Sequence, residues 1–229
     1  MKNRSKAIWA IAAANFRYLV PAYIVTGVFL LVGVYNLIAS LTGLIDNNYV
    51  DIANYFYVFA VIAPIIIVSR NFKRVMYLNG SKHDFYFGCF LNYVIGAGSI
   101  SLIDIIIFLI AKNTLGSTLV IWNLVDVFGW WEHGMVIAYV QQFSFLLLIE
   151  IFMHTLTSIQ NRWYGWVMDI ILAAILIVFI PISELRSLLV QFFNLIIFNQ
   201  RISPQIFSCL FLSVLIYMLY LPILQRKKI

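Results

Sequence analysis

Long runs of apolar residues, separated by short polar stretches, make up most of this chain of 229 residues. A membrane-spanning helix needs about 20 mainly apolar residues. Six segments reach or approach that length, and we expect spans at residues 19–41, 52–69, 85–111, 135–159, 164–182 and 206–224. The pattern therefore predicts an all-α polytopic membrane protein, with residues 1–229 forming a single transmembrane domain.

Composition supports a lipid environment. Hydrophobic residues make up 63% of the chain and charged residues only 10%, whereas soluble domains carry about 25% charged residues. A core of this size cannot bury such an excess of apolar side chains. The net charge of +6 does not indicate nucleic acid, because the cations flank the apolar runs as membrane-proximal residues do.

Two further features argue against a secreted, disulfide-bonded protein. Cys89 and Cys209 both lie inside apolar runs, where cysteine behaves as a small core residue. The apolar stretch that starts at Ala7 is interrupted by Asn15 and Arg17, so it is a poor signal peptide. We expect the amino-terminal segment to be retained.

Lysine and arginine divide unequally between the two sides of the predicted bundle. With a cytoplasmic amino terminus, twelve lie inside: Lys2, Arg4, Lys6, Arg17, Arg70, Lys73, Arg74, Lys82, Arg162, Arg226, Lys227 and Lys228. Three lie outside, at Lys112, Arg186 and Arg201, together with the acidic residues Asp46, Asp51, Asp126, Glu132 and Glu184. This follows the positive-inside rule, and we predict six spans with both termini in the cytoplasm.

Three segments do not fit a plain bundle. Residues 3–17 are amphipathic and too polar to span, so we expect a helix in the cytoplasmic interface, the alternative being a frayed extension of the first span. Residues 112–134 carry Trp122, Trp130 and Trp131, which favour the outer membrane surface, as anchors or as ligand contacts. In residues 183–205 the apolar run Leu188–Phe198, broken by Gln191 and Asn194, is too short to cross, and we expect a short helix or helical hairpin that enters from outside.

Ionisable groups inside spans are costly and are functional candidates. Four occur here, namely Asp104, Glu150, His154 and Asp169. Glu150 and His154 are four residues apart and share a helix face, and Asp169 and Glu150 fall roughly in the middle of their spans. The four residues would relay protons, or they would form hydrogen bonds that hold the helices together.

No catalytic motif is present. His83, His133 and His154 are predicted inside, outside and within a span, so they cannot share one metal ion. The chain has no HExxH, no G-x-S-x-G and no G-x-x-x-x-G-K-[ST] sequence. We therefore predict no active site, metal or cofactor in this chain, and any ATP would be bound by a partner chain.

The basic loop between spans two and three, residues 70–84, has the pattern of a short amphipathic helix. Phe72, Val75 and Met76 fall on one side, and Arg70, Lys73, Arg74 and Tyr77 on the other. Asn79-Gly80 is a typical helix end, and Ser81 is placed to cap the next helix. The loop is either a positively charged anchor or an element that docks into a partner protein.

The sequence RNFKRVMYLNGSKHDFYFGCFLNYVIG, residues 70–96, resembles the first cytoplasmic loop of the small permease subunits of bacterial ABC-2 type transporters. The resemblance rests on Arg70-Asn71-Phe72 before a short helix, the turn Gly80-Ser81-Lys82, and the aromatic-to-glycine segment from Phe85 to Gly88. Family members also have an amino-terminal interfacial helix, six spans and external half-helices between spans five and six. Lys82-His83 departs from the Arg-Lys usual in the family.

The resemblance implies a subunit of an ATP-driven exporter in the bacterial cell membrane. Two permease chains would pair along spans one and five, and two ATPase subunits, which bind ATP and Mg, would dock beneath them. The ATPase-coupling helix would use Arg70, Asn71, Phe72, Lys73, Arg74, Tyr77, Gly80, Ser81 and Lys82. The expected cargo is amphipathic or hydrophobic (a peptide, an antibiotic or a lipid), and small members of the family often confer resistance to antimicrobial peptides.

A second hypothesis is a proton-coupled secondary transporter that uses Asp104, Glu150, His154 and Asp169. The chain shows no internal repeat of the kind common in such carriers, which favours the exporter. An intramembrane enzyme is the least favoured hypothesis, because no set of catalytic groups converges in the predicted topology.

Overall fold

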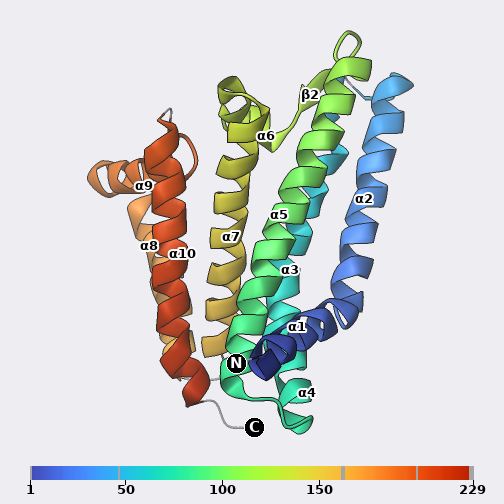
Figure 1. Ribbon diagram of the computed structural model, residues 1–229. Helices are drawn as coiled ribbons and strands as arrows, with labels where there is room; N and C mark the ends of the chain where they lie inside the picture. The colour runs from blue at the N-terminus through green and yellow to red at the C-terminus, as the bar shows by residue number, and fades with distance from the viewer. Residues whose placement is uncertain (1, 46, 161–162, 200, 227–229) are drawn as a thin grey trace.

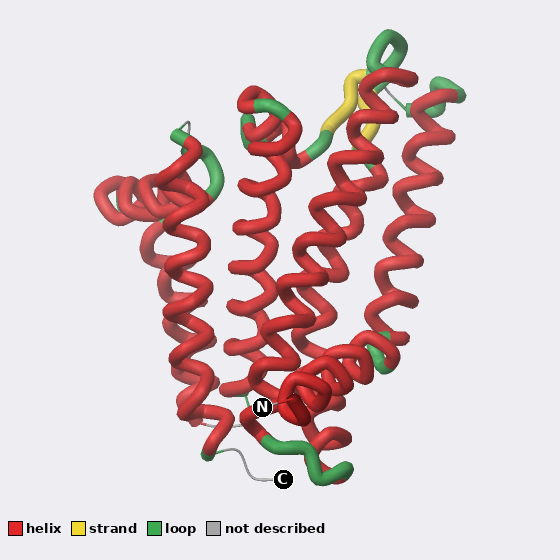
Figure 2. Tube along the Cα trace, in the orientation of Figure 1, coloured by secondary structure: helices red, strands yellow, loops and turns green. Residues whose placement is uncertain are grey.

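The computed structural model describes residues 2–45, 47–160, 163–199 and 201–226, which form a helical bundle with one short pair of strands (Figures 1 and 2). Four of the charges sorted above, Asp46, Arg162, Lys227 and Lys228, lie outside these residues. The prediction of an all-α polytopic membrane protein is confirmed at this level.

Most of the described helices run side by side (Figure 1). They are α2 (Val20–Leu41), α3 (Tyr57–Ile66), α5 (Lys82–Leu115), α7 (Met135–Ile159), α8 (Trp163–Phe179) and α10 (Ile202–Gln225). Five runs in the described residues are long and apolar enough to cross a membrane: Val20–Leu41, Ile52–Tyr77, Lys82–Leu115, Met135–Ile159 and Ile202–Gln225. A sixth results when α8 and α9 (Ser183–Ile196), which meet at a bend of 116°, count as one broken span.

The bundle has two distinct ends (Figure 1). The first, here called the α4 end, carries α1 (Lys2–Arg17), α4 (Phe72–Tyr77) and the last turn of α10. The second, the strand end, carries β1 (Asn48–Val50), β2 (Val120–Trp122), α6 (Leu124–Val127), the 3₁₀ helix Trp130–His133 and α9. The segments predicted to face the cytoplasm therefore share one end, and those predicted to face outward share the other.

The second candidate span consists of consecutive helical segments of different types. A 3₁₀ helix, Ile52–Phe56, leads into α3, and a π-helical turn, Ile67–Asn71, joins α3 to α4. Asp51 caps the start, because its Oδ1 accepts a hydrogen bond of 3.2 Å from the amide of Ala53. Turns of π-helix inside α-helices are rare and often lie at functional sites. Here the turn connects the membrane-type helix directly to the short helix α4.

The strand pair was not predicted. β1 and β2 run parallel, with Tyr49 opposite Ile121, and they join the α2–α3 loop to the α5–α7 loop. The predicted surface position is wrong for Trp130, which is only 1% exposed. Its Nε1 donates a hydrogen bond of 2.9 Å to the carbonyl of Ile197, so this tryptophan ties the α5–α7 loop to the turn between α9 and α10.

The two segments predicted to lie beside the bundle are both helical. α1 is a separate helix that crosses the α4 end at an angle to α2 (Figure 1), which excludes a frayed extension of the first span. Its position in a membrane interface stays a prediction. Within the predicted segment 183–205, Ser183–Ile196 form the single short helix α9, which lies across the strand end, and α10 begins at Ile202; residue 200 lies outside the described residues.

The main core lies between α3, α5, α7 and α10, and includes Phe85, Tyr93, Leu146, Ile151 and Tyr220. In contrast, α2 and α8 present mostly exposed apolar side chains, among them Ile24, Leu31, Trp166 and Ile177. Neither Cys89 nor Cys209 forms a disulfide, and both are buried, as the sequence indicates.

Candidate functional site

The helix α4 has one buried face and one exposed face. Phe72, Val75 and Met76 are buried in the main core, as their spacing predicts. The Phe72 ring packs edge-on against Phe85 of α5, with 5.3 Å between ring centroids. Tyr77 and Leu78 lie at the far end of the helix and are 74% and 76% exposed. From the sequence, Leu78 was expected to end the coupling helix but was not named as a contact residue, because a lone leucine next to a turn carries no distinct signal.

The end of α4 is tightly defined. The amide of Gly80 donates to the carbonyl of Val75 (2.9 Å) and the amide of Asn79 to the carbonyl of Met76 (3.1 Å), which is the pattern of a Schellman motif. Asn79, rather than the expected Gly80, has the positive φ of 58°. Gly80 is needed for a different reason: an added Cβ would lie 2.5 Å from Cγ1 of Val75.

The next helix, α5, begins with the predicted cap. The amide of Asp84 donates a hydrogen bond of 3.0 Å to Oγ of Ser81. Such a bond satisfies one of the amides that are left without partners at a helix start. The turn between α4 and α5 is therefore fixed at both sides by local hydrogen bonds.

The four cations near α4 have different environments. The guanidinium of Arg74 lies over the ring of Tyr18, 3.9 Å from its centroid, and Nζ of Lys82 donates a hydrogen bond of 3.0 Å to the carbonyl of Gln225. Arg70 and Lys73 are exposed. The exposed members of the predicted coupling set are therefore Arg70, Lys73, Arg74, Tyr77 and Ser81. Of these, Arg74 also lies over the ring of Tyr18, so Arg70, Lys73 and Tyr77 are the ones chosen below to test a partner contact.

Two residues of that set face inward, contrary to the expectation that they would contact a partner. Phe72 and Asn71 are each 1% exposed. The Nδ2 of Asn71 donates to Oδ1 of Asn15 at 3.3 Å and to the carbonyl of Asn15 at 3.4 Å. A buried amide needs such partners, so Asn71 attaches the π-helical turn to α1.

The same asparagine network holds α1 on α5. Nδ2 of Asn15 donates to Oδ1 of Asn92 at 2.9 Å, and Nδ2 of Asn92 donates to the carbonyl of Ala12 at 3.0 Å. The helices approach closely at Gly88, where an added Cβ would lie 2.8 Å from Cγ2 of Ile11. Asn15 and Asn92 were not predicted as a pair; their only signal is an amide within an apolar run.

The four ionisable residues predicted inside spans do not form one continuous relay. Glu150 and His154 share a helix face of α7, as predicted, and both face α5. An added Cβ at Gly96 would lie 2.9 Å from Oε1 of Glu150, and Nδ1 of His154 forms a hydrogen bond with the hydroxyl of Tyr93. Oε2 of Glu150 has no hydrogen-bond partner in the described residues.

Asp169 and Asp104 have hydrogen-bond partners outside the Glu150–His154 pair. Asp169, the seventh of the 17 residues of α8, accepts a hydrogen bond of 2.8 Å from Nε2 of Gln160, the residue that follows α7. Asp104 is near the strand end of α5, where Oδ1 accepts a hydrogen bond of 3.0 Å from Nδ2 of Asn123. Asp104 and Asp169 therefore form hydrogen bonds with residues other than Glu150 and His154.

Asp104 belongs to a buried network that sequence reasoning did not find. Nδ2 of Asn123 also donates to Oδ2 of Asp51 at 3.0 Å, and Nε2 of Gln142 donates to Asp104 and to the hydroxyl of Tyr57. Asp51, Asp104, Asn123 and Gln142 are all fully buried. Burial raises the pKa of Asp51, and its hydrogen bonds, first that from Asn123, oppose the shift.

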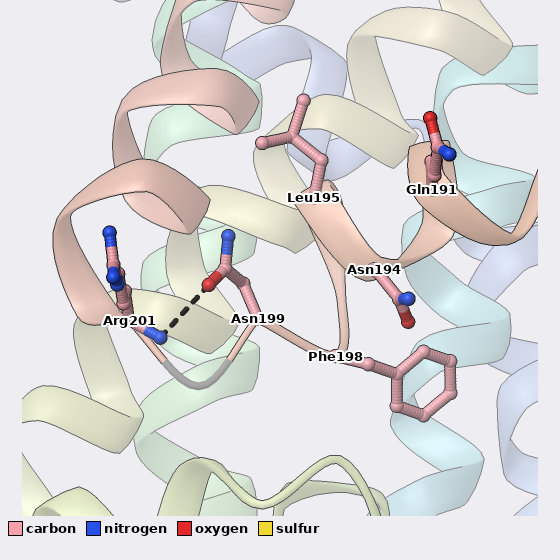
Figure 3. Close-up of a pocket in the computed structure, with 6 residues that line it drawn as sticks. All are labelled: Gln191, Asn194, Leu195, Phe198, Asn199 and Arg201. Carbon is pink, nitrogen blue, oxygen red and sulfur yellow. Dashed lines mark hydrogen bonds between the residues drawn. The ribbon is translucent and has the colours of Figure 1, made fainter. Parts of the chain in front are cut away.

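One open pocket of about 590 Å³ lies at the turn between α9 and α10, at the strand end (Figure 3). It is lined by Gln191, Asn194, Leu195, Phe198, Asn199 and Arg201. Oδ1 of Asn199 accepts a hydrogen bond of 2.9 Å from the backbone amide of Arg201. The labelled side chains point in different directions (Figure 3), so they do not converge on one ligand position.

In the part of the chain that the structure describes, no group of three or more histidine, cysteine, aspartate or glutamate residues is arranged to hold a metal ion. The best-defined candidate for a partner contact is the exposed face of α4. No family model, no curated protein and no solved structure matches this chain.

Proposed function

We propose that this chain is the transmembrane permease subunit of an ATP-driven exporter in the bacterial cell membrane. Separate ATPase subunits would bind ATP and Mg, and the cargo would be an amphipathic or hydrophobic molecule such as a peptide, an antibiotic or a lipid. The α4 end would face the cytoplasm. The observation that carries this proposal is the geometry of α4: a short helix, exposed at its tip and firmly attached to the bundle at its base.

A docking element must present contacts that a partner can reach. Arg70, Lys73 and Tyr77 are exposed on or next to α4, and Leu78 extends the apolar part of this surface. Aromatic residues and arginine are enriched at protein interfaces, where a few such side chains provide most of the binding energy. The exposed face of α4 therefore has the composition of a small interface.

A coupling element must also transmit movement. α4 continues the second candidate span through the π-helical turn and contacts α5 through Phe72 and Phe85. The π-helical turn is bonded to α1 through Asn71 and Asn15, and Arg74 contacts Tyr18 in the break between α1 and α2. Displacement of α4 would move α3, α5 and α1 together, because packed elements shift as units rather than deforming continuously. This connection is what ATP-driven closure of a partner would require.

The exposed apolar sides of α2 and α8 agree with the same proposal. Exposed apolar surface on a membrane helix contacts lipid or another protein. In the proposed exporter a second permease chain, identical or different, would cover part of α2 and α8, and lipid would cover the rest. The proton-coupled carrier receives less support, since Asp104, Asp169 and the Glu150–His154 pair have separate partners.

The test is co-purification of the chain with the ATPase encoded beside it, followed by measurement of ATP hydrolysis in lipid vesicles. We expect a stable complex whose hydrolysis falls at least tenfold in the triple variant Arg70→Glu, Lys73→Glu, Tyr77→Ala. The matched control is Arg186→Glu, an exposed cation of α9 at the opposite end, which should keep normal hydrolysis.

Two results would count against the proposal. One is a wild-type chain that never associates with the ATPase. The other is a triple variant that assembles and hydrolyses ATP at the rate of the wild-type complex and of the control.

A further inference from the structure

The buried network at the strand end contains two acids and no base. Asp51 precedes the 3₁₀ helix Ile52–Phe56, and Asp104 lies on α5; the amide of Asn123 bridges the two carboxyl groups, with 3.0 Å to each. Neither carboxylate forms an ion pair within the described residues. Two negative charges held this close and out of water disfavour each other strongly.

The titratable groups that face the two acids do not supply a positive charge. The hydroxyl of Tyr49 on β1 lies 3.5 Å from Oδ1 of Asp51. The hydroxyl of Tyr57 on α3 accepts a hydrogen bond from Nε2 of Gln142, the nitrogen that also donates to Asp104. Both tyrosines are neutral at physiological pH, since burial raises the pKa of Tyr49 to about 12 and ordinary tyrosine titrates near pH 10. The other two members of the network are neutral side-chain amides, Gln142 on α7 and Asn123 immediately before α6.

The network also lacks one hydrogen-bond donor. A side-chain amide has two N–H groups; those of Asn123 go to Asp51 and Asp104, and those of Gln142 go to Tyr57 and Asp104. Oε1 of Gln142 is buried and has no partner in the described residues. Leaving a buried oxygen without a donor costs about 1–3 kcal/mol. A proton bound to one of the two carboxyl groups would supply the missing positive charge. With the side-chain amide of Gln142 flipped, so that Oε1 takes the place of Nε2 beside Asp104, the carboxyl O–H would also supply the missing donor.

We propose that Asp51 and Asp104 hold one proton between them, and that the protonated network is a latch that keeps the strand end closed. The network joins the segment after β1, α3, α5, the start of α6 and α7, so loss of the proton would place uncompensated charge between all of them. A sodium ion is the less favoured occupant, because it would relieve the charge without supplying a donor to Gln142.

The latch does not depend on the proposed function. Its test is infrared spectroscopy of the reconstituted full chain, which distinguishes a protonated carboxyl group from a carboxylate by its C=O stretching band. Glu150 is also buried, so the measurements use the Glu150→Gln chain as background. At pH 7 we expect a carboxyl band that disappears when the pH is raised and that is absent from the Asp51→Asn/Asp104→Asn double variant.

A control variant and two single variants test whether the infrared band belongs to Asp51 and Asp104. Asp126→Asn, at an exposed position of α6, should leave the band unchanged. Asp51→Asn or Asp104→Asn alone should lower the midpoint of the remaining carboxyl group by about one pH unit or more, since the neighbouring like charge is gone.

Three outcomes would overturn the proposal. The first is a Glu150→Gln chain without any protonated-carboxyl band at pH 7, which is decisive even if the double variant does not fold. The second is a band that survives in a folded double variant, or midpoints that do not move in the single variants. The third is loss of the band at pH 7 when choline is replaced by sodium, which would assign the site to the metal cation.

Discussion

The guanidinium of Arg74 lies 3.9 Å from the centre of the Tyr18 ring, and this contact joins the short helix α4 to the start of α2. Tyr18 sits in the break between α1 and α2, where the chain turns from the α4 end into the bundle. The contact therefore connects three segments that the proposed ATPase docking would have to move together.

Replacing Tyr18 by leucine should weaken this attachment. Exposed cation–π pairs contribute about 0.5–1 kcal/mol, so we expect a small decrease in thermal stability and faster proteolysis of the loop that contains α4. The double-mutant cycle with Arg74→Met isolates the pair. Tyr77→Leu is the control, because it changes an exposed tyrosine over which no cation of the described residues lies. A coupling energy of zero in the cycle would show that the two side chains do not interact.

Replacing Gly88 by alanine should loosen α1 from α5. The new Cβ would lie 2.8 Å from Cγ2 and 3.1 Å from Cβ of Ile11, and overpacking of this kind typically costs about 1–3 kcal/mol. The matched control is Gly27→Ala in α2, where an added Cβ meets nothing within 4 Å and helix propensity favours alanine. Melting of both variants in detergent checks the difference, and Ile11→Ala should rescue Gly88→Ala but not improve the control.

Replacing Asn79 by glycine should preserve or raise stability, unlike the two substitutions above. Its φ of 58° is unfavourable for residues with a Cβ and is accepted most readily by glycine. We expect Asn79→Gly to preserve or raise the melting temperature and Asn79→Val to lower it by several degrees, since a β-branched residue is strained there. Equal stability of the two variants would mean that the turn after α4 does not adopt this backbone conformation in solution.

The pH dependence of stability follows from Asp51. Burial raises the pKa of this carboxyl group above its value in the unfolded chain, so the folded state binds the proton more tightly. Its contribution to stability is therefore complete at pH values below the unfolded pKa of about 3.9 and is lost as the pH rises through the folded pKa. Melting temperatures measured from pH 4 to pH 9 should fall for the wild-type chain, and Asp51→Asn should flatten part of that slope; a parallel slope in the variant would contradict this.

The long helices could be predicted from the sequence because their signal is local. The predicted span 135–159 coincides with α7, and the predicted span 85–111 is the apolar centre of α5. α5 extends further, from Lys82 to Leu115, because hydropathy records where a helix is apolar and not where its hydrogen bonds end. The helix α4 and the cap at Ser81 were predictable for the same reason: their spacing and turn residues lie within a few positions.

Contacts between distant segments could not be predicted. The strands β1 and β2 have three residues each, too few for a pattern, and they pair across the whole of α3 and α5. Tryptophan suits both a membrane interface and a buried site with a hydrogen-bond acceptor, so the composition of the loop could not reveal that Trp130 is buried. Asn71 is ambiguous in the same way. An amide beside a basic helix can contact a partner protein or another residue of the same chain, and here it contacts Asn15.

The most direct test of the proposed function asks what lies next to α4 in the membrane. A photoreactive amino acid at position 77, in place of Tyr77, would be activated by light in membranes that also contain the neighbouring ATPase. We predict a covalent adduct between the two chains that changes in yield when ATP is bound, and no adduct from the same photoreactive group in place of Arg186 at the strand end. If position 77 never captures the ATPase while the two proteins are present together, α4 is not the docking element and the chain is not the exporter subunit proposed.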